Sequence, residues 1–190
     1  NTPEGKSTIA KLADVIVDSN DKRIDMVKSA YDSYHITVDH TRTLADMIKA
    51  GKYDYVNADI VEKNFPILRP DVIGATTGGG PFRTQGVQIT NIELVLVHLN
   101  KVATTTEVLA YMDKLGLHPA RIEELLALGE KYPNIQRDYP LVALGSIWAV
   151  SSRRRVVPYL YMGGSKRDLS LRWVGTGDTW NDACRFVAVS

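Results

Sequence analysis

The chain has 190 residues, of which 44% are hydrophobic and 24% charged, and its formal net charge is +1. This composition is typical of a globular protein with a sizeable core and excludes a disordered chain. The longest apolar runs, such as "IELVLVHL" at 92–99, are far shorter than the roughly 20 residues of a membrane-spanning helix, so no membrane span is predicted.

The first part of the chain is predicted to be mainly helical. The segments "STIAKLADVIVDSN" (7–20) and "DKRIDMVKSAYDSY" (21–34) place apolar residues at helical spacing. A further short helix, capped by Thr43, is predicted to end at Gly51, and the Tyr/Val-rich stretch after it favours a strand.

The stretch "RPDVIGATTGGGPFRTQG" (69–86) concentrates proline and glycine, which is typical of a linker or long loop. We therefore predict an N-terminal, mainly helical module at 1–73, a linker at 74–86 and a second domain at 87–190.

The second domain is predicted to begin with a β-rich run, "VQITNIELVLVHLN", followed by two helices. The first helix should end at Gly116, and Pro119 should open the second. After Pro140 the short segments "LVALGSIWAV", "RVVPYLYM", "DLSLRWV" and "CRFVAV" predict an antiparallel sheet. The chain as a whole is thus predicted to be an α+β protein.

The sequence also predicts a turn and the directions of side chains in this sheet. "GGSKRD" (163–168) predicts a hairpin turn, because glycine accepts a positive φ. In "DLSLRWV", alternation predicts that Trp173 points inward with Leu169 and Leu171, whereas Arg172 points outward.

Four segments, in this order, resemble the C-type lectin-like fold: "TTTEVLAYMDKLGLHPARIEELLALGEKYP", "GSIWAVSS", "VPYLYMGGSKRDLSLRW" and "CRFVAVS". They are most similar to its disulfide-free branch, which includes formylglycine-generating-enzyme-like proteins and many bacterial domains. Variable proteins of diversity-generating retroelements use the same scaffold and randomise exposed residues around the last strands for ligand binding. The resemblance covers 87–190 and implies a binding or display module.

The tripeptide Trp180-Asn181-Asp182 is one that many calcium-dependent C-type lectins carry near the C-terminus. Calcium prefers about six to eight oxygen ligands, and residues 141–179 contain neither the Glu-Pro-Asn nor the Gln-Pro-Asp loop of those lectins. We therefore expect Trp180 to pack under the sheet and Asn181 and Asp182 to form a turn before the last strand. No metal or cofactor is expected.

Other reactive side chains are few. The only cysteine, Cys184, cannot form an internal disulfide or the cysteine pair that holds copper in formylglycine-generating enzymes, and its strand-like surroundings predict a buried thiol. A single cysteine is compatible with a cytoplasmic location, and the compartment is left open. In "YHITVDH", an extended backbone places His35 and Asp39 on one face and His40 on the other, so we interpret them as surface or boundary residues.

Residues of the types that anchor interfaces gather near the C-terminal end of the sequence. We predict that a protein or other macromolecular ligand contacts Arg155, Tyr159, Tyr161, Lys166, Arg172, Trp173, Asp178, Thr179, Trp180 and Asn181. No convergent catalytic set accompanies them, so a non-catalytic role is expected.

Two alternatives stay open. One is a metal-dependent enzyme descended from the formylglycine-generating scaffold. The other is a polyanion-binding protein, because residues 141–190 hold seven Lys or Arg against three Asp or Glu. Its site would comprise Arg153, Arg154, Arg155, Lys166, Arg167 and Arg172. The segment contains neither a basic helix nor a known nucleic-acid motif, so nucleic acid is not the favoured ligand.

Overall fold

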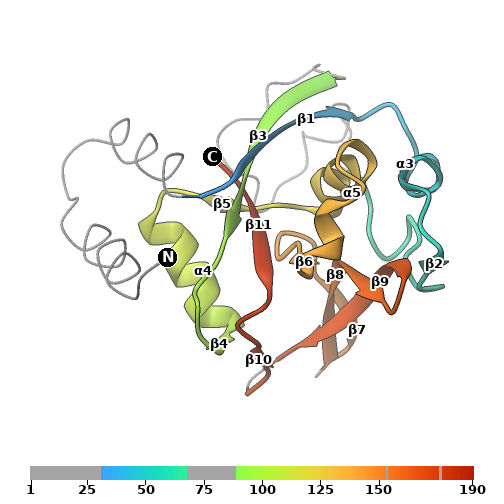
Figure 1. Cartoon of the computed structure of the whole chain (residues 1–190). Coiled ribbons are helices and arrows are strands. Elements are labelled where there is room, and N and C mark those ends of the chain that lie inside the picture. The colour runs from blue at the N-terminus through green and yellow to red at the C-terminus, as the bar shows by residue number, and fades with distance from the viewer. Residues whose placement is uncertain (1–30, 68–88, 153, 176) are drawn as a thin grey trace, which may run out of the picture.

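The computed structural model describes residues 31–67, 89–152, 154–175 and 177–190 (Figure 1). In chain order its elements are β1 (Ser33–Asp39), α3 (Leu44–Gly51), β2 (Tyr55–Val56), β3 (Ile89–Val97), β4 (Ala103–Thr104), α4 (Thr105–Lys114), β5 (His118–Pro119), α5 (Ile122–Lys131), the 3-10 helix η2 (Ile135–Arg137), β6 (Leu141–Val142), β7 (Trp148–Ser151), β8 (Arg154–Gly163), β9 (Lys166–Val174), β10 (Thr179–Trp180) and β11 (Arg185–Val189). These helices and strands agree with the predicted α+β class.

A nine-stranded sheet organises the molecule, with the order β1-β3-β11-β6-β8-β9-β2, while β5 pairs with β11 and β7 with β8. Most pairs are antiparallel, and the exceptions among the described strands are β11 with β6 and β2 with β9. The strands β4 and β10 form a separate antiparallel pair. The strand β11 therefore lies inside the sheet, between β3 and β6.

Separate cores pack on the two faces of the sheet. The α3–α5 core includes Leu44, Leu96, Leu125, Leu160, Leu169 and Val187. The α4 core includes Val97, Val108, Val157, Trp180, Cys184 and Phe186. Because successive strand residues point to opposite faces, β3 and β11 contribute to both cores and are predominantly apolar.

The helix ends follow from local sequence. Thr43 and Thr104 cap α3 and α4, and each forms a reciprocal capping box with the residue three positions later. Gly116, predicted to end the first helix of the second domain, has a φ of 71°. The prediction for Pro119 is wrong: it lies opposite Ala188 in β5, and α5 begins three residues later at Ile122.

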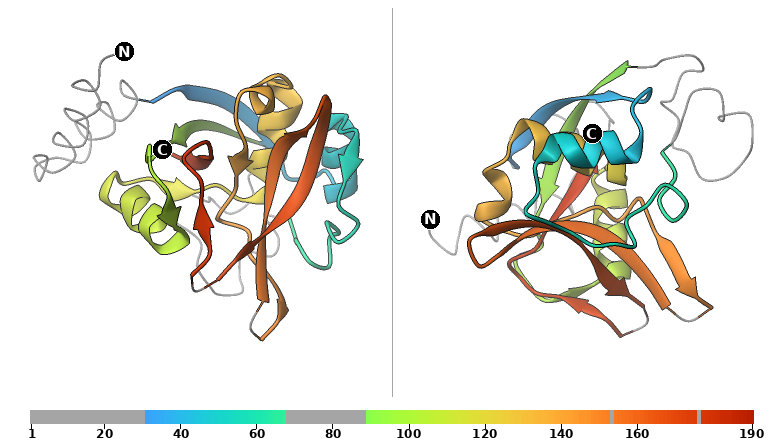
Figure 2. Two further views of the ribbon diagram at one scale, coloured as in Figure 1. Left: turned by 60° about the horizontal axis from the view of Figure 1, so that its bottom comes forward. Right: turned by 90° about the vertical axis from the view of Figure 1, so that its right-hand side faces the viewer.

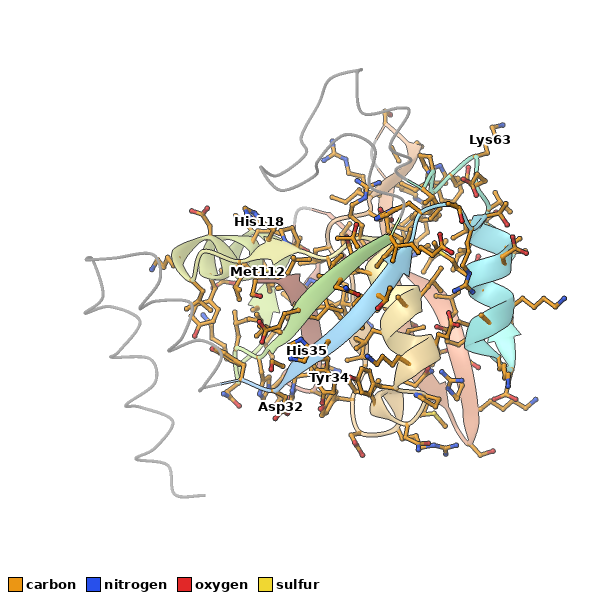
Figure 3. All side chains as sticks on the ribbon, turned by 90° about the horizontal axis from the view of Figure 1, so that it is seen from above. Asp32, Tyr34, His35, Lys63, Met112 and His118 are labelled. Atoms are coloured by element: carbon orange, nitrogen blue, oxygen red, sulfur yellow. The ribbon has the colours of Figure 1, made fainter. Side chains whose placement is uncertain are left out.

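The described part of the predicted N-terminal module joins the same sheet as the rest of the chain. Seven residues of β1 pair with β3, beside which Figure 3 shows it, and β2 pairs with β9. The predicted helix at 21–34 is wrong at Ser33 and Tyr34, which begin β1 because β3 offers this segment a pairing partner. Residues 1–30 and the predicted linker at 74–86 lie outside the described residues.

The strand β1 is held against α5 as well as β3. The carbonyl oxygen of His35 accepts bonds from Lys131 Nζ at 2.8 Å and Tyr132 Oη at 3.1 Å. His35 is exposed, as predicted, but His40 is buried, because its ring turns inward beside Thr90 with Nε2 3.3 Å from Oγ1. His40 is therefore not a surface residue. Within the described ranges, no helix is long and apolar enough to cross a membrane.

The buried Arg167 connects the β8–β9 hairpin to the helices α3 and α5. Figure 2 shows both helices on the same side of the hairpin. Arg167 is 8% exposed, and its guanidinium donates to the carbonyl oxygens of Gly51 in α3, at 2.6 Å, and Gly129 in α5, at 2.8 Å. The Tyr53 ring packs against it with its centroid 5.0 Å from Cζ. A Cβ at Gly129 would lie 2.3 Å from Tyr53 Oη, so glycine makes room for this packing.

Replacing Arg167 by methionine is expected to lower the free energy of unfolding by about 3 kcal/mol, because the carbonyls of Gly51 and Gly129 lose their buried donor. Guanidinium chloride denaturation of the variant and the wild type measures this difference. The matched control is Lys166→Met, the adjacent exposed residue, which should change stability by less than about 0.5 kcal/mol. Equal losses in the two variants would show that the buried guanidinium does not stabilise the fold.

Candidate binding face

Ten residues were predicted from sequence to contact a ligand, and five of them lie on one side of the β8–β9 hairpin. The two strands pair in continuous register from Arg155 opposite Val174 to Gly163 opposite Lys166. Gly164, with a φ of 67°, lies in the tight turn between them, which confirms the hairpin turn predicted from "GGSKRD".

Alternate residues along each strand share a side of the sheet, and so do residues directly opposite each other. One side of this hairpin, which we name the hairpin face, therefore carries Arg155, Tyr159, Tyr161, Lys166 and Arg172. Six residue steps separate the first and third of these, about 20 Å at the usual strand rise. Half of the predicted set is thus brought together by one supersecondary unit.

The two tyrosines form the apolar centre of the hairpin face. Tyr159 and Tyr161 are half-buried and stack with their ring centroids 4.8 Å apart and an interplanar angle of 15°. Burial is the main effect that raises the pKa of Tyr161 to about 12, followed by a hydrogen bond with Asp168. The Tyr161 phenol is consequently protonated near neutral pH.

The structure adds residues that sequence reasoning missed. Asp168 and Ser170 lie opposite Tyr161 and Tyr159, and β2 places the exposed Tyr55 in register with Asp168. Asp168 and Ser170 could have been found from their alternation with Arg172 along β9. Tyr55 could not, because its strand is two residues long and pairs with a distant segment.

Trp173 lies on the opposite side of the hairpin and is 48% exposed, so the prediction that it points inward is wrong. It does share a side with Leu169 and Leu171, but only Leu169 is fully covered by the α3–α5 core. The α3–α5 core does not extend along β9 as far as Trp173. Instead, the guanidinium of Arg154 lies over its ring, 5.3 Å from the centroid.

Trp180 is 2% exposed, which confirms that it packs under the sheet and means that it does not offer a ligand its surface. Its Nε1 donates to Thr105 Oγ1 at 3.0 Å, and its ring meets Phe186 edge-on. The strand β10 is thereby fixed at the first turn of α4.

The first turn of α4 is itself stabilised by hydrogen bonds to the carboxylate of Glu107. The Glu107 carboxylate accepts the Thr104 backbone N–H at 2.8 Å, and this bond, with those from the Thr104 hydroxyl and Lys101, lowers the pKa of Glu107 to about 2. Thr104 also pairs with Thr179 of β10. The N-terminal cap of α4 and the strand β10, which carries Thr179, are therefore joined directly.

Arg172 connects the hairpin to β10. Its guanidinium carbon lies 5.2 Å from the centroid of the Trp180 ring, and Nη2 donates to the Thr179 carbonyl at 3.5 Å. The exposed side chains of Thr179 and Asn181 follow on this strand and the turn after it. Asp178 is exposed in the preceding turn, where its N–H donates to Gly175.

The turn before the last strand is as predicted. The Cys184 N–H donates to the Asn181 carbonyl at 3.4 Å, and its thiol donates to Asn181 Oδ1 at 3.1 Å. Cys184 is buried, as expected, and burial raises the pKa of its thiol. The carbonyl of Asp182 lies 2.6 Å from His98 Nε2.

The basic set proposed for a polyanion is not a single surface. Arg167 is buried against α3 and α5, Arg154 lies on the side of Trp173, and Arg153 lies outside the described residues. In the part of the chain that the structure describes, no group of three or more His, Cys, Asp or Glu side chains could hold a metal ion.

No family model, curated protein or solved structure matches this chain. Functional interpretation therefore depends on the geometry of the hairpin face.

Trp173 and Trp180 allow a matched test of this geometry. Trp180→Ala is expected to lower the free energy of unfolding by about 3 to 5 kcal/mol, because it empties a fully packed site. Trp173→Ala should cost less than about 1 kcal/mol, because the side chain is half exposed. Urea denaturation of both variants measures the difference, and a larger loss for Trp173→Ala would contradict the assignment of sides.

Proposed function

We propose that this protein is a non-catalytic ligand-binding or display module on a C-type lectin-like scaffold, and that it presents the hairpin face to a protein or other macromolecular ligand. One observation carries the proposal: side chains of interface-anchoring types, two stacked tyrosines and two arginines among them, share one side of a regular hairpin. Backbone pairing forms the hairpin, and on this side Val157 and Val174 also pack in the α4 core. The exposed parts of the tyrosine and arginine side chains are available for recognition.

The order of the elements supports the scaffold. A long strand, two helices and a run of further strands follow one another in 89–189, which is the order on which the resemblance to C-type lectin-like domains depends. Among the later strands, β8 and β9 are at least as long as β3. The last strand, β11, pairs with the first of them, β3.

The chemistry of the hairpin face supports binding over catalysis. A general base near neutral pH needs a pKa near the working pH, whereas the pKa of Tyr161 is about 12. The neighbouring Asp168 is 8% exposed and lies against that phenol. Surface contact is the role that these side chains fit best.

A random peptide library displayed on phage and selected on the immobilised full chain tests the proposal. Selected peptides are expected to lose about tenfold or more in affinity for the double variant Tyr159→Ala, Arg172→Ala, because interface anchors are removed. The matched control removes one aromatic ring and one arginine from the other side of the same hairpin, Trp173→Ala with Arg154→Ala. Peptides that lose affinity only for the control would contradict the proposed face.

The diversification role has its own test in the neighbouring DNA. If this protein is the target of a diversity-generating retroelement, a reverse-transcriptase gene and a near-copy of the codons for 155–185 lie beside its gene. The two copies should differ at the codons of exposed hairpin-face residues and agree at the codon of Trp180. Without such a repeat the diversification proposal fails, whereas ligand binding by the hairpin face does not depend on it.

A further inference from the structure

We infer that the ligand of the hairpin face is an acidic protein segment, which binds through carboxylates to Arg172, Arg155 and Lys166 and packs apolar side chains on the tyrosine pair. This inference rests on the proposed function and specifies the partner of the same face.

The charge of the hairpin face is not neutralised within the described molecule. Arg155, Lys166 and Arg172 are exposed, and none forms an ion pair with a described residue. The carboxylate on this side of the hairpin belongs to Asp168, which is buried beside Tyr161. Along the hairpin, exposed cations therefore lie on both sides of the tyrosine pair, with the buried Val157 of the α4 core between Tyr159 and Arg155.

Arg172 is positioned in advance for a carboxylate. Stacking on Trp180 and the bond to Thr179 O restrict the guanidinium, and Trp180 is in turn held by Thr105. The bond to Thr179 uses one of its five N–H donors, and the planar fork matches a carboxylate in bidentate geometry. Because less side-chain freedom is lost on binding, such a fixed arginine contributes more affinity than a mobile one.

The same geometry favours protein over nucleic acid. Single-stranded nucleic acid stacks its bases on open aromatic faces, whereas Tyr159 and Tyr161 stack on each other at 4.8 Å. Duplex binding commonly uses about 6 to 10 phosphate contacts, more than the three cations of the hairpin face offer. An acidic segment with interspersed apolar residues fits both the charges and the tyrosines.

Fluorescence anisotropy with labelled probes and the full chain tests the inference. The probes are a peptide of about 12 alternating Glu and Leu residues, long enough to cover the face at about 3.3 Å per residue, its Gln/Leu counterpart and a thymidine oligonucleotide of equal charge. We expect the Glu/Leu peptide to bind about tenfold more tightly than the Gln/Leu peptide, and its affinity to fall as salt rises.

Variants then locate the contact. Arg172→Ala should weaken binding of the Glu/Leu peptide about tenfold, and Arg172→Lys should weaken it less but measurably, because lysine lacks the planar fork. Arg137→Ala, which removes an equal charge from the exposed end of η2, should leave the affinity unchanged.

Each contrary result is informative. Equal binding of the Glu and Gln peptides, or no binding of the Glu peptide, overturns the inference of an acidic partner. Tighter binding of the oligonucleotide overturns it in favour of nucleic acid. In these cases the phage-selected peptides decide independently whether the hairpin face binds a ligand, so the inference can fail while the proposed function stands.

Discussion

The guanidinium of Arg167 lies where the carbonyl ends of two helices meet the β8–β9 hairpin, and the position of that hairpin depends on it. Gly51 is the last residue of α3 and Gly129 lies in the last turn of α5, so the cation faces the negative ends of two helix dipoles. Carbonyl groups at helix ends otherwise need water or a cap. One side chain thus satisfies both helices and fixes the strand that carries Lys166 and Arg172.

Alternation along β9 places buried and exposed side chains next to each other in the sequence. Arg167 and Leu169 face the α3–α5 core, while Lys166 and Arg172 belong to the hairpin face. Substitution of Lys166 therefore leaves the buried contacts of Arg167 intact, whereas Arg172 itself contacts the buried Trp180. A second anchor acts from the other side, where Trp180 and the first turn of α4 hold β10 beneath Arg172.

Sequence patterns predicted those features that depend on residues close together in the chain. The cap at Thr43, the turn at Gly164 and the burial of Trp180 follow from nearby residues or strong apolar character. The exposure of Trp173 could not be predicted, because alternation fixes the side of a residue but not where the core beneath it ends. The burial of Arg167 also escaped prediction, since its acceptors lie 116 and 38 residues away in the sequence.

The placement of β11 has a consequence for the order of folding. This strand, Arg185–Val189, lies between β3 and β6 and contributes to the cores on both faces. Until it is available, β1 and β3 form one half-sheet, β6, β8 and β9 form another, and no described strand pairing joins them. Closure therefore requires contacts between segments far apart in the sequence, which slows folding. While a nascent chain still lacks this strand, both half-sheets expose unpaired edges, the state in which a β-protein is most prone to aggregate.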